Sequence, residues 1–208
     1  MIGQLAGCDL VFGLDPRPVD AGPGAEGPGS EGPGGEDSPV GVKVVFATKR
    51  AMTGAMGGLV GADATCQADA TEAALPGTFK AWLSDGSESP SIRMTRHPGP
   101  YVLTNSHPVA TSWDDLTDGM LTESIHVTAN GLATTGIAVC GGIHAGVWSS
   151  TAIDGTLAGT ATCTNWTSND PGLAAPPGDL LATNAFWTLT ATCVVPCDTP
   201  MQIYCVEQ

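Results

Sequence analysis

This sequence has few positively charged residues. Only 7 of its 208 residues are Lys or Arg, against 21 Asp and Glu, which gives a formal net charge of −14. The few cations are scattered along the chain, so the acidic total hides no basic patch. This charge disfavours partners that attract cationic proteins, namely nucleic acids, heparin-like polyanions and anionic membrane surfaces.

Long hydrophobic runs and catalytic motifs are also missing. No apolar run approaches the roughly 18 residues that a membrane helix requires. There is no nucleophile-elbow motif, and the four histidines are scattered singly: His97, His107, His126 and His144. Cys193 and Cys197 lack the second pair of ligands that zinc requires. We therefore expect no catalytic residues, no metal and no cofactor.

The seven cysteines are informative because their number is odd. An odd number is compatible with a secreted disulfide protein only if one cysteine forms no disulfide within the chain. With Cys8 set aside, six remain as a disulfide framework: Cys66, Cys140, Cys163, Cys193, Cys197 and Cys205. Such a framework forms in an oxidising compartment, so the cysteines predict an exported protein.

Cys8 follows Leu5-Ala6-Gly7, which is the small-residue step that a lipoprotein signal peptidase cleaves. Only seven residues precede Cys8 and none is basic. A secretory signal begins with a basic region and an apolar run of about 7–15 residues. We interpret residues 1–8 as the remnant of a signal that starts upstream, with the lipid on Cys8. The alternative is a chance match with a free thiol.

Residues 9–40 are mostly Gly, Pro and acid, and "GPGAEGPGSEGPGGE" repeats with period five over Gly22–Glu36. Collagen requires Gly at every third position, so this is not a triple helix. A segment with so little to bury is expected to be a disordered tether, with a reach of roughly 30 Å. The folded domain is then expected over residues 41–208.

The pattern within that domain predicts one main helix and several short strands. Ala62, Cys66 and Ala70 recur at helical spacing, and the helix should stop at Pro76-Gly77. Strands are expected in six segments that alternate or are β-branched: Val42–Thr48, Thr78–Asp85, Pro100–Asn105, Ser124–Gly131, Gly146–Ser150 and Met201–Glu207. Cys163–Cys193 should be mostly loop. The sequence thus predicts a small α+β domain stapled by disulfides.

Several of these segments resemble the endostatin domain found at the C-terminus of certain collagens. "GGLVGADATCQADATEAALPGTFKAWLS" (Gly57–Ser84) is similar to the opening of that domain. "SWDDL", "VWSS", "CTNW" and "CDTPMQIYCVEQ" follow in the family's order. The likeness is closest to a bacterial branch found on lipoproteins and covers nearly all of Val42–Gln208. It implies a C-type-lectin-like fold with mostly antiparallel strands.

The resemblance also implies two nested disulfides, Cys66–Cys205 and Cys163–Cys197. Cys140 and Cys193 have no counterpart in the family, and we expect them to form a third bridge. The family's zinc site depends on N-terminal histidines and its heparin site on an arginine surface. The chain has neither, so zinc and heparin are not carried over, and the calcium-dependent sugar motifs of C-type lectins are missing too.

Two stretches remain as candidate binding loops. In "NWTSND", Asn165, Asn169 and Asp170 could offer oxygen ligands to a hard cation. The alternative, which we favour, is a loop whose Asx turns satisfy its own backbone. "WDDLTDG" (Trp113–Gly119) clusters three carboxylates, and we favour a helix N-terminus there.

Two tryptophans lie in the loop-rich last third of the chain. Trp166 or Trp187 could serve as a stacking platform for a sugar ring or as an anchor for a protein partner. Burial in the core is the alternative for each, because a domain rich in Ala and Gly needs large side chains to fill its volume.

These features predict a binding module that recognises a glycan or a protein and is no enzyme. We expect it to be monomeric and exported, anchored by its N-terminal lipid to the bacterial envelope, at the outer membrane and cell surface or at the periplasmic face. The lipid would be its only contact with the membrane. The alternatives are a structural or adhesive envelope protein without a dedicated pocket and a hydrolase with an unrecognised site.

The lipidation of Cys8 can be tested by expressing the protein from an extended reading frame. The product should be acylated and should partition into a detergent phase, because a diacyl-type anchor binds stably to membranes. The Cys8→Ser variant should stay in the aqueous phase. Equal partitioning of the two proteins would contradict the lipobox interpretation.

Overall fold

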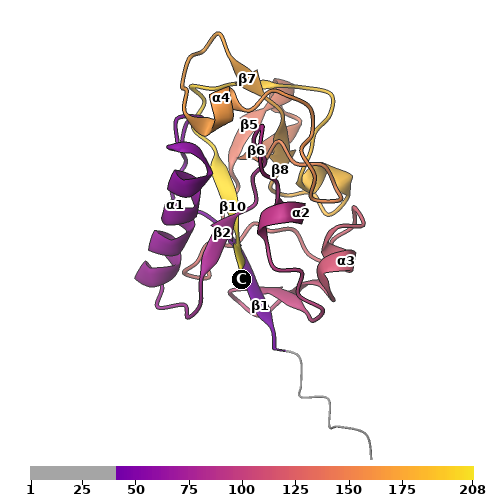
Figure 1. Cartoon of the computed structure of the whole chain (residues 1–208). Helices are drawn as coiled ribbons and strands as arrows, with labels where there is room; N and C mark the ends of the chain where they lie inside the picture. Colours follow the sequence, from indigo (N-terminus) through magenta and orange to yellow (C-terminus); the bar gives the residue numbers. More distant parts are fainter. Residues whose placement is uncertain (1–40) are drawn as a thin grey trace, which may run out of the picture. The chain divides into compact units, whose positions relative to one another are not determined.

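The computed structural model of the chain describes residues 41–208. The signal remnant with Cys8 and the tether expected over residues 9–40 lie outside the described residues. The described part is a mixed α+β domain (Figure 1). Its helices are α1 (Gly58–Glu72), α2 (Pro90–Arg93), α3 (Trp113–Leu116) and α4 (Cys163–Trp166), with 3₁₀ turns η1 (Cys140–Gly142) and η2 (Ala185–Trp187).

One curled sheet contains eight of the strands, in the order β4-β3-β1-β10-β6-β5, with β2 added to β10 and β8 added to β6. A separate two-stranded sheet pairs β7 with β9. The strands are β1 (Lys43–Ala47), β2 (Phe79–Ala81), β3 (Tyr101–Leu103), β4 (Pro108–Ala110), β5 (Ile137–Val139), β6 (His144–Trp148), β7 (Ala174–Ala175), β8 (Pro177–Asp179), β9 (Val195–Pro196) and β10 (Gln202–Glu207).

The last strand, β10, lies at the centre of the domain (Figure 1). One edge of β10 pairs antiparallel with β1, in the register Phe46↔Cys205. The other edge pairs antiparallel with β2 and parallel with β6. The first and last strands of the described domain are therefore neighbours, and the remaining elements are built out from them.

The two faces of β10 belong to two different hydrophobic cores. Met201, Ile203 and Cys205 lie in the core that α1 covers. Tyr204 and Val206 point to the opposite face, into a core rich in aromatic rings. This alternation follows from the two-residue period of a strand. Both faces are buried, so the strand has an almost continuous apolar sequence.

Helix α1 packs closely on the sheet because its buried face is made of small residues, among them Ala62, Cys66 and Ala70. Its polar side chains add specific contacts: Asp63 Oδ1 accepts a hydrogen bond of 2.8 Å from the Ala81 amide. The other oxygen of Asp63 forms an ion pair with Arg93, whose side chain is almost fully buried. Helix α1, strand β2 and helix α2 are thereby held in one arrangement.

Three disulfides staple the domain: Cys66–Cys205, Cys140–Cys193 and Cys163–Cys197. These are the pairs that the resemblance and the remaining two cysteines implied. Four of the six cysteines are buried, whereas Cys140 and Cys193 are partly exposed. Three such bonds indicate an oxidising environment, extracellular or periplasmic. Within residues 41–208, no helix is both long and apolar enough to cross a membrane.

A buried network of hydroxyl groups joins the long loops to the sheet. Ser84 Oγ and Thr151 Oγ1 lie 2.8 Å apart, and Trp82 Nε1 donates to Thr188 Oγ1 at 2.7 Å. Ser149 Oγ also lies 3.1 Å from Thr188 Oγ1. All of these side chains are inaccessible to solvent. Buried polar groups of this kind are costly unless paired, so the network fixes how the loops approach β2 and β6.

Most of the expected elements are confirmed, and one is wrong. The main helix and the strands that we expected at Val42–Thr48, Thr78–Asp85, Pro100–Asn105, Gly146–Ser150 and Met201–Glu207 correspond to α1, β1, β2, β3, β6 and β10. Ser124–Gly131 forms no strand and makes only single bridges, because the chain turns back at Asn130-Gly131 and pairs Val127 with Ala133. The helix N-terminus that we favoured at "WDDLTDG" is also confirmed. It is the start of α3, where Ser112 Oγ accepts a hydrogen bond from the Asp115 amide.

The buried Tyr204 predicts a loss of stability in alkali. Its hydroxyl donates to the carbonyls of Trp187 and Asp179. Burial, and then the charge of Asp179, raise the pKa of Tyr204 well above its usual value. The unfolded chain ionises Tyr near pH 10, so the contribution of Tyr204 is complete below about pH 10 and is lost as pH rises above that value. Burial also raises the pKa of Tyr101.

We therefore expect the free energy of unfolding to fall from about pH 10 upward, by at most about 1.4 kcal/mol per pH unit for each tyrosine. Tyr204→Phe should cost about 1–2 kcal/mol at pH 7, because two carbonyls lose a donor, and should make the alkaline decline shallower. Denaturant titrations at several pH values measure both effects. A Tyr204→Phe protein with an unchanged alkaline slope would contradict the prediction.

Candidate functional site

The tryptophans expected as ligand platforms are in the core. Trp166 and Trp187 are at most 1 % exposed, and none of the five tryptophans is more than 4 % exposed. Trp166 Nε1 donates to the Ser84 carbonyl at 2.8 Å, and its ring packs edge-on against Trp148. The prediction that Trp166 or Trp187 stacks on a sugar is therefore wrong, because the long loops fold inward and use these rings to fill volume.

The loop "NWTSND" uses its polar atoms internally, as the favoured alternative to a cation site predicted. Asn165 Oδ1 accepts from the Gly86 amide at 3.0 Å and from Thr162 Oγ1 at 3.1 Å. Asp170 Oδ1 accepts from the Gly172 amide at 2.8 Å, which is an Asx turn. Asn169 is exposed and makes no side-chain hydrogen bond within the described residues. Among residues 41–208 there is no group of three His, Cys, Asp or Glu side chains that could hold a metal ion.

The same loop contains an unusual backbone. Cys163, Thr164, Asn165 and Trp166 all have positive φ, between 50° and 63°. The Trp166 amide bonds to the Thr162 carbonyl at 2.8 Å, so α4 is one turn of left-handed helix. That conformation costs L-residues roughly 1–2 kcal/mol each. Three contacts hold the turn in place: the Cys163–Cys197 disulfide, the burial of the Trp166 ring, and the hydrogen bond from the Gly86 amide to the Asn165 side chain.

A histidine–carboxylate pair lies elsewhere in the domain, on adjacent strands. His144, at the start of β6, and Asp179, at the end of β8, come together because β8 pairs antiparallel with β6. Their Nδ1 and Oδ2 atoms are 2.9 Å apart, and the side chains are only 12 % and 13 % exposed. Asp179 Oδ1 also accepts from the amides of Ala145 and Leu181. The carboxylate thus accepts three hydrogen bonds and orients the imidazole ring.

These two residues line a cleft of about 400 Å³. Its lining includes the small residues Gly136, Ala138 and Ala145 and the larger apolar residues Ile143 and Leu181. Phe186 adds a ring edge-on to His144, with the centroids 5.5 Å apart. No lysine or arginine lines the cleft. A cavity of this size lies in the lower part of the range of small-ligand pockets, so it can also hold a single side chain.

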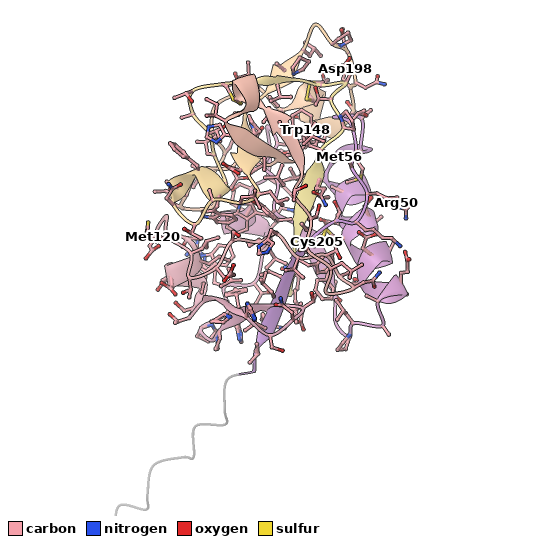
Figure 2. The ribbon with its side chains drawn as sticks, turned by 180° about the vertical axis from the view of Figure 1, so that it is seen from behind. Arg50, Met56, Met120, Trp148, Asp198 and Cys205 are labelled. Atoms are coloured by element: carbon pink, nitrogen blue, oxygen red, sulfur yellow. A yellow bond between two sulfur atoms is a disulfide. The ribbon has the colours of Figure 1, made fainter. Side chains whose placement is uncertain are left out.

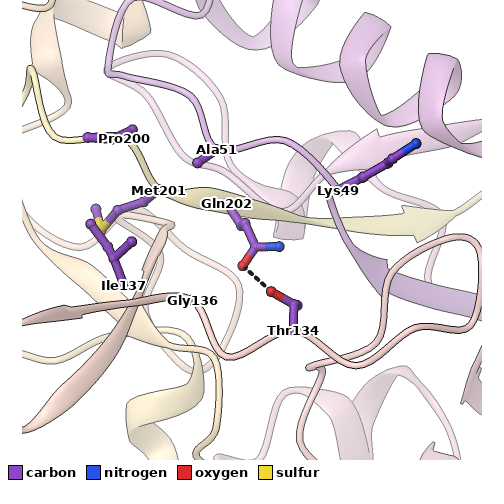
Figure 3. Close-up of a pocket in the computed structure, with 8 residues that line it drawn as sticks. All are labelled: Lys49, Ala51, Thr134, Gly136, Ile137, Pro200, Met201 and Gln202. Carbon is purple, nitrogen blue, oxygen red and sulfur yellow. Dashed lines mark hydrogen bonds between the residues drawn. The ribbon is translucent and has the colours of Figure 1, made fainter.

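A smaller hollow of about 200 Å³ shares Gly136 with the cleft (Figure 3). Its polar groups are already used: Thr134 Oγ1 donates to Gln202 Oε1 at 3.1 Å. Figure 3 shows Lys49 extending away from this pair, and its ammonium lies 2.7 Å from Glu72 Oε1. The hollow therefore offers a ligand fewer free groups than the cleft does.

The geometry of the cleft limits its chemistry. With Nδ1–H donated to Asp179, a neutral His144 presents Nε2 as a hydrogen-bond acceptor. Nothing in the described residues hydrogen-bonds to Nε2, and His144 has no Ser, Thr or Cys partner there. A nucleophile activated by His requires such a contact. The pair therefore has the geometry of a fixed acceptor for a ligand.

Little in the sequence indicated this pair. His144 and Asp179 are 35 residues apart and belong to no recognisable motif. The only local signal was an acid that follows a short Pro-Gly segment and precedes two leucines. Of the four scattered histidines, the structure gives His144 a carboxylate partner at 2.9 Å, whereas His126 has Glu123 only at 4.0 Å.

Comparison with known proteins adds no assignment. The chain matches no protein-family model and no curated protein sequence.

The left-handed turn yields a prediction about stability. Thr164 is exposed, has φ 55° and is β-branched, so Gly at this position should relieve strain. We expect Thr164→Gly to raise the free energy of unfolding by about 1 kcal/mol. The control, Thr160→Gly, changes an exposed threonine without positive φ and should lower it by about 0.5–1 kcal/mol. Equal effects in denaturant titrations would contradict the strained turn.

Proposed function

We propose that the described domain is a binding module of the endostatin-like branch of the C-type-lectin-like fold, exported and lipid-anchored at the bacterial envelope. Three features support the fold: the pairing of β1 with β10, the bond Cys66–Cys205 between the main helix and the last strand, and the bond Cys163–Cys197 across the final loops. The disulfides support the exported location.

The observation that carries a binding role is the cleft beside His144. Its imidazole is oriented by a carboxylate that accepts three hydrogen bonds, its second nitrogen is free, and apolar side chains surround it. A mostly apolar concave site with few fixed polar groups is what ligand sites have in common. The ligand class that we propose is a glycan or a protein at the cell surface, bound without metal.

A hydrolase is the second candidate, and the same pair of side chains favours it. A carboxylate that orients a histidine is a recurring part of hydrolytic sites. The missing part is a hydroxyl or thiol within hydrogen-bond reach of His144 in the described residues. Turnover of simple esters or glycosides that His144→Asn abolishes would favour this candidate over binding. A structural envelope role would leave the cleft without any ligand.

The binding role can be tested by screening the full-length, oxidised protein on glycan and peptide arrays, with calcium and then with chelator. We expect ligands whose binding survives chelation, since the structure offers no metal cluster in residues 41–208. Asp179→Asn should weaken binding about tenfold by releasing His144. Exposed Asp198→Asn is the matched control. Absence of any glycan or peptide ligand would contradict the binding role.

A further inference from the structure

Exposed apolar side chains gather around His144. Ile143 is 75 % exposed, Leu181 50 % and Phe186 42 %. Ile143 and Leu181 both line the cleft, and Phe186 packs against the His144 ring. Surface leucines and isoleucines that occur singly need no explanation, but a contiguous group beside a cleft marks an interaction site.

The group extends past η2 toward α3. Gly119 lies against two side chains: a Cβ built on it would be 3.5 Å from Ile153 Cδ1 and 3.7 Å from Ala185 Cβ. The Leu121 amide also donates to the Thr183 carbonyl at 2.7 Å. Met120, between these residues, is largely exposed, and Figure 2 shows it projecting outward at the edge of the domain. We call Met120, Ile153, Phe186, Leu181 and Ile143 the apolar strip.

Carboxylates accompany the apolar strip along its length. Asp118 precedes Met120 and accepts its amide at 2.8 Å. Asp154 follows Ile153, and its hydrogen bonds from Thr156 lower its pKa, so the group is ionised at neutral pH. Asp179 lines the cleft at the other end. In a chain of net charge −14, this surface attracts cationic groups and repels anionic ones.

The apolar strip also lacks the exposed tryptophan and tyrosine rings that are typical of sugar-binding sites. All five tryptophans and both tyrosines are buried, so the strip exposes no Trp or Tyr ring for a sugar to stack on. The exposed side chains are aliphatic, apart from Phe186, and aliphatic and aromatic anchors next to a polar rim are typical of protein interfaces.

We propose that the apolar strip docks a segment of a partner protein in which apolar side chains stand next to Lys or Arg. This proposal rests on the proposed binding role and names its ligand class. One apolar side chain of the segment enters the cleft, and a backbone or side-chain N–H donates to His144 Nε2. The lysines or arginines lie near Asp118 and Asp154, while Asp179 holds His144 in place.

The test uses three capped eight-residue peptides and the full-length, oxidised protein labelled with ¹⁵N. Alternating Leu and Lys represents the proposed ligand, alternating Leu and Glu reverses its charge, and alternating Ser and Lys removes its apolar anchors. The Ser-Lys peptide also measures attraction to the acidic residues that precede Gly41. Amide shifts on titration give both the affinity and the place of binding.

We expect the Leu-Lys peptide to bind at least about tenfold more tightly than the other two and to shift amides of the apolar strip. Ile143→Ser with Leu181→Ser should weaken it about tenfold. The control, Val60→Ser with Val42→Ser, changes two exposed valines on α1 and just before β1 and should have no effect. Phe186→Ser, tested alone, guards against misfolding of the double variant.

Other results overturn the proposal. If the Leu-Glu peptide bound as tightly as the Leu-Lys peptide, charge would play no part in recognition. If the Leu-Lys peptide shifted only amides outside the apolar strip, the strip would not be the binding surface. No binding of any peptide would exclude this ligand class, and a glycan that shifts the strip would replace it. Array ligands that bind elsewhere would leave the binding role standing while this proposal fails.

Discussion

Strand β10 is buried on both faces, and this constraint places every other part of the described domain. Because its side chains alternate, Met201, Ile203 and Cys205 face α1 while Tyr204 and Val206 face the aromatic core. Its two edges are also used, by β1 on one side and by β2 and β6 on the other. The Cys66–Cys205 bond then closes a loop of 139 residues and ties the main helix to the strand.

The long loops are ordered by internal contacts and not by regular structure. Tryptophan side chains fill the space between sheet and loops, and the hydroxyl network around Thr188 pairs the Trp82 indole and the Ser149 hydroxyl. The buried Trp187 Nε1 has no hydrogen-bond partner in the described residues. The left-handed turn at Cys163–Trp166 is the cost of this arrangement, since it brings the Trp166 ring into the core while Cys163 reaches Cys197. The long loops therefore contribute side chains to the hydrophobic core.

The candidate site lies on a different part of the frame. The pairing of β6 with β8 sets Asp179 opposite Gly146, two residues from His144, so the sheet places the acceptor. The proposed strip combines this rigid acceptor with exposed apolar groups and negative charge. A module of this kind can select cationic protein segments by charge while its anchors supply affinity.

The sequence by itself determined the main helix, five of the six expected strands, the disulfide framework and the acidic surface, because alternation, small-residue spacing, cysteine number and charge are local properties. Only the tertiary structure decided that Ser124–Gly131 forms no strand and that Trp166 and Trp187 are buried. The contact between His144 and Asp179, which are 35 residues apart, is also visible only in the tertiary structure. Burial and long-range pairing depend on how the loops pack on β10, and no short stretch of sequence encodes that packing.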